Sequence, residues 1–145
     1  MSKIEDFLSV EEEQEIVEAI RVAELNTSGE IRVHIEKTSQ GDATHRALEL
    51  FHILKMDNTK LQNAVLIYVA VDDKTFVIYG DKGINALVET DFWDSTKDAI
   101  QSHFKKEHFK QGLIEGILKS GEQLKKYFPY ESDDTNELTN EISKG

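Results

Sequence analysis

The sequence contains no cysteine among its 145 residues. Disulfide bonds, thiolate catalysis and zinc sites built from cysteine are therefore excluded. Positive charge is also scarce, because 17 lysines and arginines stand against 28 aspartates and glutamates, which leaves a net charge of -11. Nucleic acids and anionic membranes would be repelled by such a chain, so we expect neither as a partner.

Long apolar runs are absent as well. The longest, residues 64–71, has eight residues, whereas a helix that crosses a bilayer needs about 20. Residues 1–6 lack the basic and apolar regions of a signal peptide. We therefore expect a soluble, cytoplasmic protein without membrane insertion, and we expect it to be a monomer.

Apolar residues make up 39% of the chain and fall into periodic blocks, which is typical of a single globular domain. A capping box between Ser9 and Glu12 opens the first predicted helix. The helical period then predicts helices over residues 10–25, 43–55, from about 91, and from 109 to about 128. A period of two predicts a strand over 30–36, and the apolar run over 64–71 suits a central strand. A third strand is expected over 75–79, after a tight turn.

The connection between the first two strands contains a whole helix, so these strands are expected to be parallel, with the third antiparallel to them. This topology places Glu30 and Asp81 at one end of the sheet and Asp72 and Asp73 at the other. After Pro129 the composition becomes acidic and poor in apolar residues. We therefore expect one domain over residues 1–129 and an acidic, disordered tail over 130–145.

Acidic residues gather around a glycine turn, residues 80–83, and the helix start that follows it. The candidate metal ligands are the acids that the predicted topology can bring to one end of the sheet: Asp81, Asp91, Asp94, Glu30, Glu89 and Glu107. Such oxygen ligands favour calcium, with magnesium or manganese as alternatives, and two ions could be bridged. The spacing does not match an EF-hand loop.

Simpler roles remain open for the same residues. Asp91 can cap a helix, Asp94 can complement the helix dipole, and Asp81 can stabilise a turn through its own backbone. The five histidines, including His34 in the first strand, form no His-Glu-x-x-His motif. We interpret them as ordinary surface residues.

Seven short segments in this order resemble the TPM domain, a family named after thylakoid-lumen, photosystem II repair and nematode receptor-modulator proteins. They are residues 8–13 (LSVEEE), 27–31 (TSGEI), 65–71, 80–84 (GDKGI), 92–93 (FW), 109–113 (FKQGL) and 121–124 (GEQL). The resemblance covers roughly residues 5–129. It implies a three-layer αβα sandwich with a small mixed central sheet of about four strands, one of which our pattern analysis does not locate. It also implies calcium binding near loops at one end of the sheet.

Three functions follow as hypotheses. The first is a divalent-cation-binding, calcium-responsive module that regulates or binds an unidentified protein partner. The second is a metal-free assembly or chaperone-like interaction protein that uses the acidic tail. The third is a metal-dependent acid phosphatase, which has been proposed for some plant relatives. We rank the phosphatase last, because a site made of carboxylates alone leaves no open coordination position and repels an anionic phosphate, and no arginine lies near the cluster in sequence. We assign no catalytic residue.

Overall fold

The computed structural model describes residues 7–89, 91–130 and 139–144. The elements follow in the order α2 (Val10–Glu24), β1 (Glu30–Glu36), α3 (Ala43–Ile53), the 3₁₀ helix η1 (Met56–Asn58), β2 (Ala64–Ala70), β3 (Thr75–Gly80), α4 (Lys82–Asn85), α5 (Asp94–Lys105), α6 (Phe109–Lys125) and β4 (Ser143–Lys144). The described helices do not combine the length and apolarity that a bilayer crossing requires.

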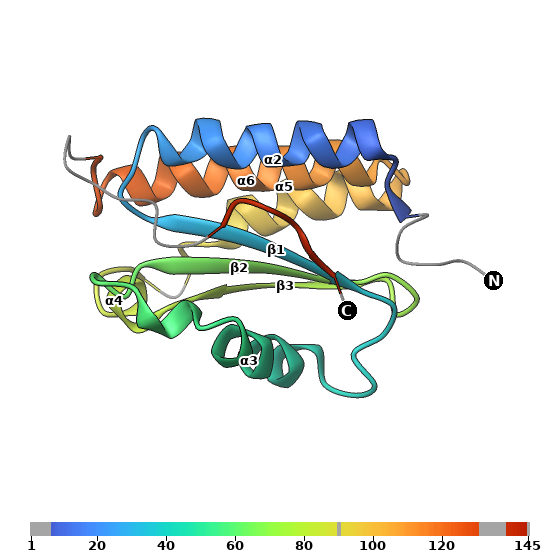
Figure 1. Cartoon of the computed structure of the whole chain (residues 1–145), viewed down its shortest axis with the longest axis horizontal. Helices are drawn as coiled ribbons and strands as arrows, with labels where there is room; N and C mark the ends of the chain where they lie inside the picture. Colours follow the sequence, from blue (N-terminus) through green and yellow to red (C-terminus); the bar gives the residue numbers. More distant parts are fainter. Residues whose placement is uncertain (1–6, 90, 131–138, 145) are drawn as a thin grey trace.

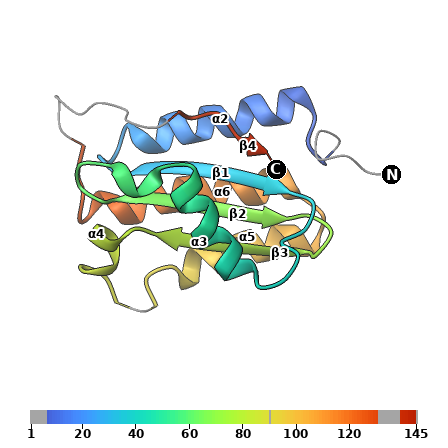
Figure 2. The same cartoon turned by 60° about the horizontal axis from the view of Figure 1, so that its bottom comes forward.

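The strands form one mixed sheet in the order β3-β2-β1-β4. Helices α2, α5 and α6 cover one face, and α3 covers the other (Figures 1 and 2). Strands β1 and β2 are parallel, and β3 is antiparallel to β2. The predicted three-layer fold and the predicted strand directions are confirmed.

Side-chain alternation along the strands divides the core in two. Odd-numbered residues such as Ile31, Val33 and Val65 pack towards α2, α5 and α6. Even-numbered residues of β2, such as Leu66 and Tyr68, pack against α3. Every position of β2 is buried, as expected for a strand covered on both faces.

The fourth strand lies in the segment for which we predicted a disordered tail. Ser143 and Lys144 pair with His34 and Ile35 of β1, so the prediction is wrong for these two residues. Two distant contacts hold them, since the hydroxyl of Ser143 lies 2.9 Å from Nδ1 of His34, and Nζ of Lys144 lies 2.8 Å from the carboxylate of Glu13. A two-residue strand fixed by such contacts has no local pattern. Residues 131–138 of the predicted tail lie outside the described residues.

The predicted capping box of α2 is present, since the N–H of Glu12 donates to the Ser9 hydroxyl at 3.1 Å and its carboxylate accepts from the N–H of Ser9 at 2.9 Å. The predicted cap of α5 is wrong. This helix begins at Asp94, with Trp93 rather than Asp91 at the N-cap and no side-chain cap. Trp93 is largely buried.

The predicted end-to-end arrangement of the acids in the sheet is confirmed. Glu30 of β1 pairs with Ala64 of β2. The carbonyl oxygen of Ala64 accepts a hydrogen bond at 3.0 Å from the N–H of Asp81, which follows β3. Asp72 and Asp73 lie in the turn between β2 and β3, at the opposite end.

Candidate functional site

Asp81 ends β3 and caps α4, and only 4% of the residue is exposed. Its carboxylate Oδ1 accepts a hydrogen bond from the N–H of Lys82 at 2.7 Å. The second oxygen, Oδ2, is buried and has no hydrogen-bond partner among the described residues. An unpaired buried carboxylate oxygen costs free energy. Within the described part of the protein, the Asp81 carboxylate is therefore hydrogen-bonded through Oδ1 but not through Oδ2.

The loop of residues 59–63 packs tightly against the segment that follows Asp81. The N–H of Gly83 donates to the carbonyl oxygen of Gln62 at 2.8 Å. A Cβ at Gly83 would lie 2.3 Å from the carbonyl oxygen of Leu61 and 2.5 Å from that of Gln62, so this approach requires glycine. The hydroxyl of Thr59, in the same loop, is also buried without a partner within the described ranges. The segment after β3 and the loop of residues 59–63 are thus in contact, and each contains a buried side-chain oxygen without a partner in the described structure.

A second concentration of negative charge lies at the same end of the sheet, where α2 turns into β1. Glu30 is buried, and Glu24 is half-buried with its carboxylate accepting from the N–H of Ile31 at 2.9 Å. Burial raises the pKa of Glu24 to about 7; the hydrogen bond from Ile31 opposes this rise, and the charge of Glu30 adds to it. We did not predict a role for Glu24, because the helix pattern alone gives no sign of its burial.

Three of the other predicted ligands lie on the surface. Asp91 and Asp94 flank Trp93, whose ring approaches Gly80, so they reach the same end of the sheet as Asp81. Their side chains and that of Glu89 are exposed. Within residues 7–89, 91–130 and 139–144 the structure contains no group of three or more histidine, aspartate or glutamate side chains arranged to hold a metal ion. The acids thus do not form a single carboxylate cluster in the described structure.

Glu107 lies at the wrong end of the sheet to join Asp81. It lines a cavity together with Val71 and Lys74, which belong to the turn between β2 and β3. Helix α5 has 12 residues and is about 18 Å long, so it carries the chain from the Asp81 end of the sheet to the opposite end. The prediction that Glu107 contributes to the same site is therefore wrong.

A buried polar network that the sequence analysis missed lies between β1, β2 and α3. Glu36 accepts hydrogen bonds from Nε and Nη2 of Arg46 at 2.9 and 3.0 Å and from the hydroxyl of Tyr68. Burial alone would raise the pKa of Glu36, but the hydrogen bonds from Arg46, Tyr68 and His34 lower it to about 2. This carboxylate is therefore ionised and fully compensated inside the protein.

His34 links this network to β4. Its Nε2 lies 3.2 Å from Glu36, and its Nδ1 lies 2.9 Å from the Ser143 hydroxyl. Burial lowers the pKa of His34, so the ring is neutral near pH 7. An ionised carboxylate only accepts, so Nε2 carries the proton and Nδ1 accepts from Ser143. The prediction that His34 is a surface residue is wrong, since it is 3% exposed.

One signal could have revealed the network. Polar residues occupy every second position of β1, and in a three-layer fold both faces of an inner strand are covered. Glu36 and His34 therefore had to be buried and to need partners. Arg46, in the helix that follows, supplies the cation that pairs with Glu36.

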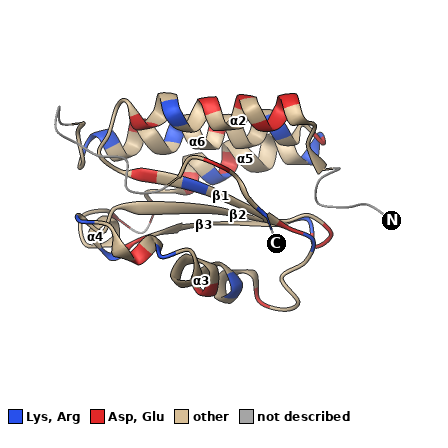
Figure 3. Ribbon diagram, in the orientation of Figure 1, with Lys and Arg blue, Asp and Glu red and all other residues tan. Residues whose placement is uncertain are grey.

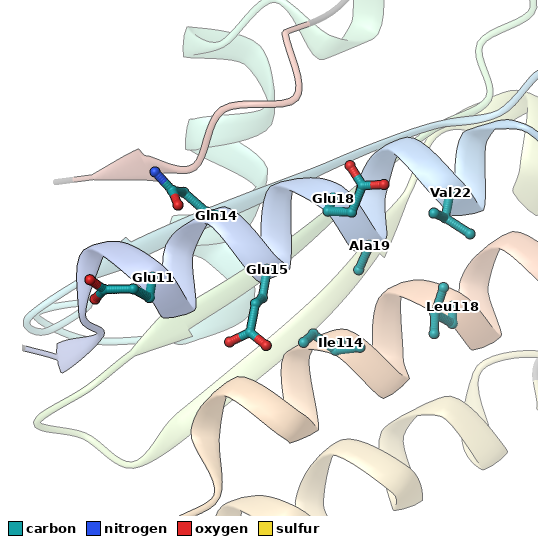
Figure 4. Close-up of a pocket in the computed structure, with 8 residues that line it drawn as sticks. All are labelled: Glu11, Gln14, Glu15, Glu18, Ala19, Val22, Ile114 and Leu118. Carbon is teal, nitrogen blue, oxygen red and sulfur yellow. The ribbon is translucent and has the colours of Figure 1, made fainter.

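The surface also carries a shallow groove between α2 and α6, with a volume of about 590 Å³ (Figure 4). Ala19 and Val22 face Ile114 and Leu118 across its floor, and Glu15 lies on its rim. Acidic residues predominate on α2, where Arg21 is the one basic residue, whereas α6 carries both signs (Figure 3). This groove offers packing area, and two of the acids that line it are already paired, Glu15 with Lys110 and Glu18 with Arg21.

The Glu24 carboxylate makes stability depend on pH. Its folded pKa is raised above 4.5, so the folded state binds more protons than the unfolded state, and this contribution to stability is lost as the pH rises from about 4.5 through about 7. Glu24→Gln keeps an acceptor for the N–H of Ile31 and removes the titration. Relative to the wild type, the variant is expected to gain stability steadily over that range in urea unfolding. A constant difference between the two proteins would contradict the assignment, and Glu122→Gln, at an exposed position, serves as the control.

The Glu36 network has the opposite dependence. Its folded pKa is lowered, so its contribution is present above about pH 4.5 and is lost as the pH falls towards 2. Glu36→Gln is expected to cost about 2–3 kcal/mol at pH 7, because Arg46 loses its charged acceptor. Chemical unfolding from pH 7 to 2.5 measures this loss, which should shrink on acidification. Glu11→Gln, on the exposed face of α2, should leave stability nearly unchanged across the series, whereas an acid-insensitive deficit in Glu36→Gln would contradict the role of its charge.

Comparison with known proteins places these features in a family. The chain is similar to the BA42 protein of the psychrophilic bacterium Bizionia argentinensis, with 68% sequence identity, a TM-score of 0.94 and full coverage of both chains. Two further domains share the fold at low identity. One is the N-terminal domain of the cg2496 protein of Corynebacterium glutamicum (14% identity, TM-score 0.64, 79% of this chain and 72% of that one). The other is the N-terminal domain of a protein from P. gingivalis (23% identity, TM-score 0.65, 84% and 79%).

The comparison with curated proteins gave no match. The model of the TPM domain family matches residues 2–123, which include the whole of the sheet except β4 and nearly all of the helices. The order of segments, the three-layer fold and this match agree, and the chain belongs to the TPM domain family.

Proposed function

We propose that this protein is a divalent-cation-binding module, with calcium as the preferred ion, in which binding orders the loops around Asp81 and so regulates contact with a protein partner. The observation that carries the proposal is the buried Oδ2 of Asp81, which has no hydrogen-bond partner among the described residues. A cation at this oxygen would supply the missing compensation and remove the cost of the unpaired charge.

The oxygens of the loop that packs against the segment after Asp81 are the candidate further ligands of a hard cation. The Thr59 hydroxyl is buried and unpaired in the described structure, and the carbonyl oxygens of Leu61 and Gln62 approach Gly83 closely. Calcium accepts carboxylate, carbonyl and hydroxyl oxygens together with water, in flexible geometry, so it does not need a cluster of carboxylates alone. Magnesium and manganese are the alternatives, because they also prefer oxygen ligands.

Glu24 and Glu30 support a second, weaker cation position at the same end. Burial is the main cause of the raised pKa of Glu24, and the charge of Glu30 adds to the rise. A divalent ion between them would favour the ionised form of Glu24, so its affinity should increase above pH 7. Asp91, Asp94 and Glu89 would contribute only as exposed acids that raise the local cation concentration.

Binding would act on two segments that are far apart in sequence. Residues 59–63 and 81–83 already touch through Gly83, and a shared ion would fasten them together. Loops of this kind are the least stable part of a fold, and tightening them changes the surface offered to a partner. This is the step by which a cation could regulate binding without any catalysis.

The other two functions have less support. A phosphatase needs positive groups beside the transferred phosphoryl group. Arg46 pairs with Glu36, and Arg21 pairs with Glu18. Arg32, in β1, has a buried Nε without a hydrogen-bond partner among the described residues, and its charged neighbour is Glu141. The hypothesis of an interaction through the acidic tail concerns residues 130–145, of which 131–138 and 145 lie outside the described ranges.

Thermal unfolding tests the proposal. At calcium concentrations about 100 times the dissociation constant, binding should stabilise the protein by about 2.7 kcal/mol and raise Tm by about 5–10 °C. Asp81→Asn should lose this increase. Without calcium, the variant should be at least as stable as the wild type, because the unpaired charge is gone.

Asp98→Asn is the matched control, because Asp98 is an exposed aspartate of α5 outside the site. It should retain the full calcium-dependent increase in Tm. An unchanged Tm in the wild type at millimolar calcium, or an equal increase in Asp81→Asn, would contradict the proposal.

A further inference from the structure

Strand β3 forms an open edge of the sheet. It is the terminal strand in the order β3-β2-β1-β4. The N–H of Asp81 points to Ala64 of β2, and in an antiparallel pair this direction alternates. The backbone N–H and C=O groups of Phe76 and Ile78 therefore point away from β2. Neither residue makes a backbone hydrogen bond outside the pairing of β2 with β3 in the described part of the chain.

The open edge is short and well defined. Towards Asp81 it is closed, because the side-chain amide of Asn85 donates to the carbonyl oxygen of Gly80 at 3.1 Å. Residues 75–77 are half-buried, whereas Ile78 is 7% exposed because its side chain packs into the core. The backbone groups of Phe76 and Ile78 that point away from β2, two donors and two acceptors, are those with which one added strand of three or four residues would pair.

An apolar cavity of about 410 Å³ opens beside this edge, on the face of the sheet that α5 covers. Four partly buried phenylalanines line it in a chain of ring contacts: Phe76 lies 5.5 Å from Phe104, Phe104 lies 5.4 Å from Phe109, and Phe109 lies 4.7 Å from Phe7. Side chains directly opposite each other in neighbouring strands share a face. A residue added opposite Phe76 would therefore place its side chain beside Phe76 and Phe104.

The rim of the cavity carries two exposed lysines, Lys74 and Lys105. In the parts of the chain that the structure describes, neither forms an ion pair. Glu107 is the acidic residue that lines the same cavity. In a chain of net charge -11, two lysines without a carboxylate partner beside an apolar cavity mark a position that favours a local negative charge.

We propose that the edge of β3 binds an extended peptide by β-strand addition, with an apolar side chain of the peptide in the phenylalanine-lined cavity and an adjacent carboxylate between Lys74 and Lys105. The main-chain groups of Phe76 and Ile78 supply the hydrogen bonds, and the cavity supplies specificity. A second copy of this chain fits the edge poorly, because pairing β3 with β3 brings together two molecules of net charge -11.

Amide hydrogen exchange, followed by ¹⁵N NMR, tests this proposal directly. In the free protein the amides of Phe76 and Ile78 should exchange much faster than those of Val77 and Tyr79, which point to β2. The probe is a seven-residue synthetic peptide with a central phenylalanine, a glutamate two residues away on each side of it, and threonine or valine at the other positions, so that phenylalanine and glutamate share one face of the strand. Saturating peptide should slow exchange at Phe76 and Ile78 at least about tenfold and shift the side-chain signals of Phe104.

Lys105→Glu should weaken peptide binding about fivefold, the upper range for one charge at a rim. Lys97→Glu is the matched control, since it makes the same change at an exposed position of α5 that does not line the cavity, and it should bind as the wild type does. The same peptide with alanine at its centre should bind more weakly than the phenylalanine peptide.

Three results would overturn the proposal. The first is protection of Phe76 and Ile78 in the free protein. The second is peptide-induced shifts confined to the groove between α2 and α6. The third is a result in which phenylpropionate shifts the Phe104 signals while the peptide leaves exchange at Phe76 and Ile78 unchanged, because the cavity would then bind a small carboxylate and not a strand.

Discussion

Burial of carboxylates is the constraint on which the rest of this structure depends. The sheet carries acids inside at both ends, and each must be paired, protonated or neutralised, because an isolated buried charge is costly. At the end where β1 finishes, Glu36 is paired with Arg46 and hydrogen-bonded to Tyr68 and His34. That end is complete without any added group, and its network also anchors β4 through Ser143.

The opposite end is not completed in the same way. Asp81 is bonded through one oxygen, and Glu24 avoids part of the cost by holding its proton to about pH 7. Both residues lie where loops meet. A cation at either position would offset the free-energy cost of the buried carboxylate through electrostatic attraction. This contrast between the two ends supports the proposal that Asp81 binds a cation, whereas Glu36 stabilises the fold. The open edge of β3 is a separate feature, since its unpaired groups belong to the backbone.

Much of the fold could be predicted because it follows from local patterns. The alternation of residues 30–36 gave β1 with its bounds, and the crossover helix gave the parallel pairing with β2. The position of Asp81 followed from that topology. Other features depend on tertiary packing: the contact of Ser143 with His34, the burial of Glu24, and the position of Glu107 at the far end of α5. No spacing in the sequence encodes them, which is why the predicted acid cluster included residues that the structure keeps apart.

The most direct test of the account is a calcium titration of the ¹⁵N-labelled protein followed by NMR. If a cation completes the Asp81 end, the amide signals of Lys82, Gly83 and residues 59–63 should shift together and reach saturation at micromolar to millimolar calcium. The signals of Arg46 and Tyr68, in the completed network, should not move. Shifts restricted to the exposed turn of Asp72 and Asp73, or no saturable shift at all, would contradict the claim that the buried charge of Asp81 binds a cation.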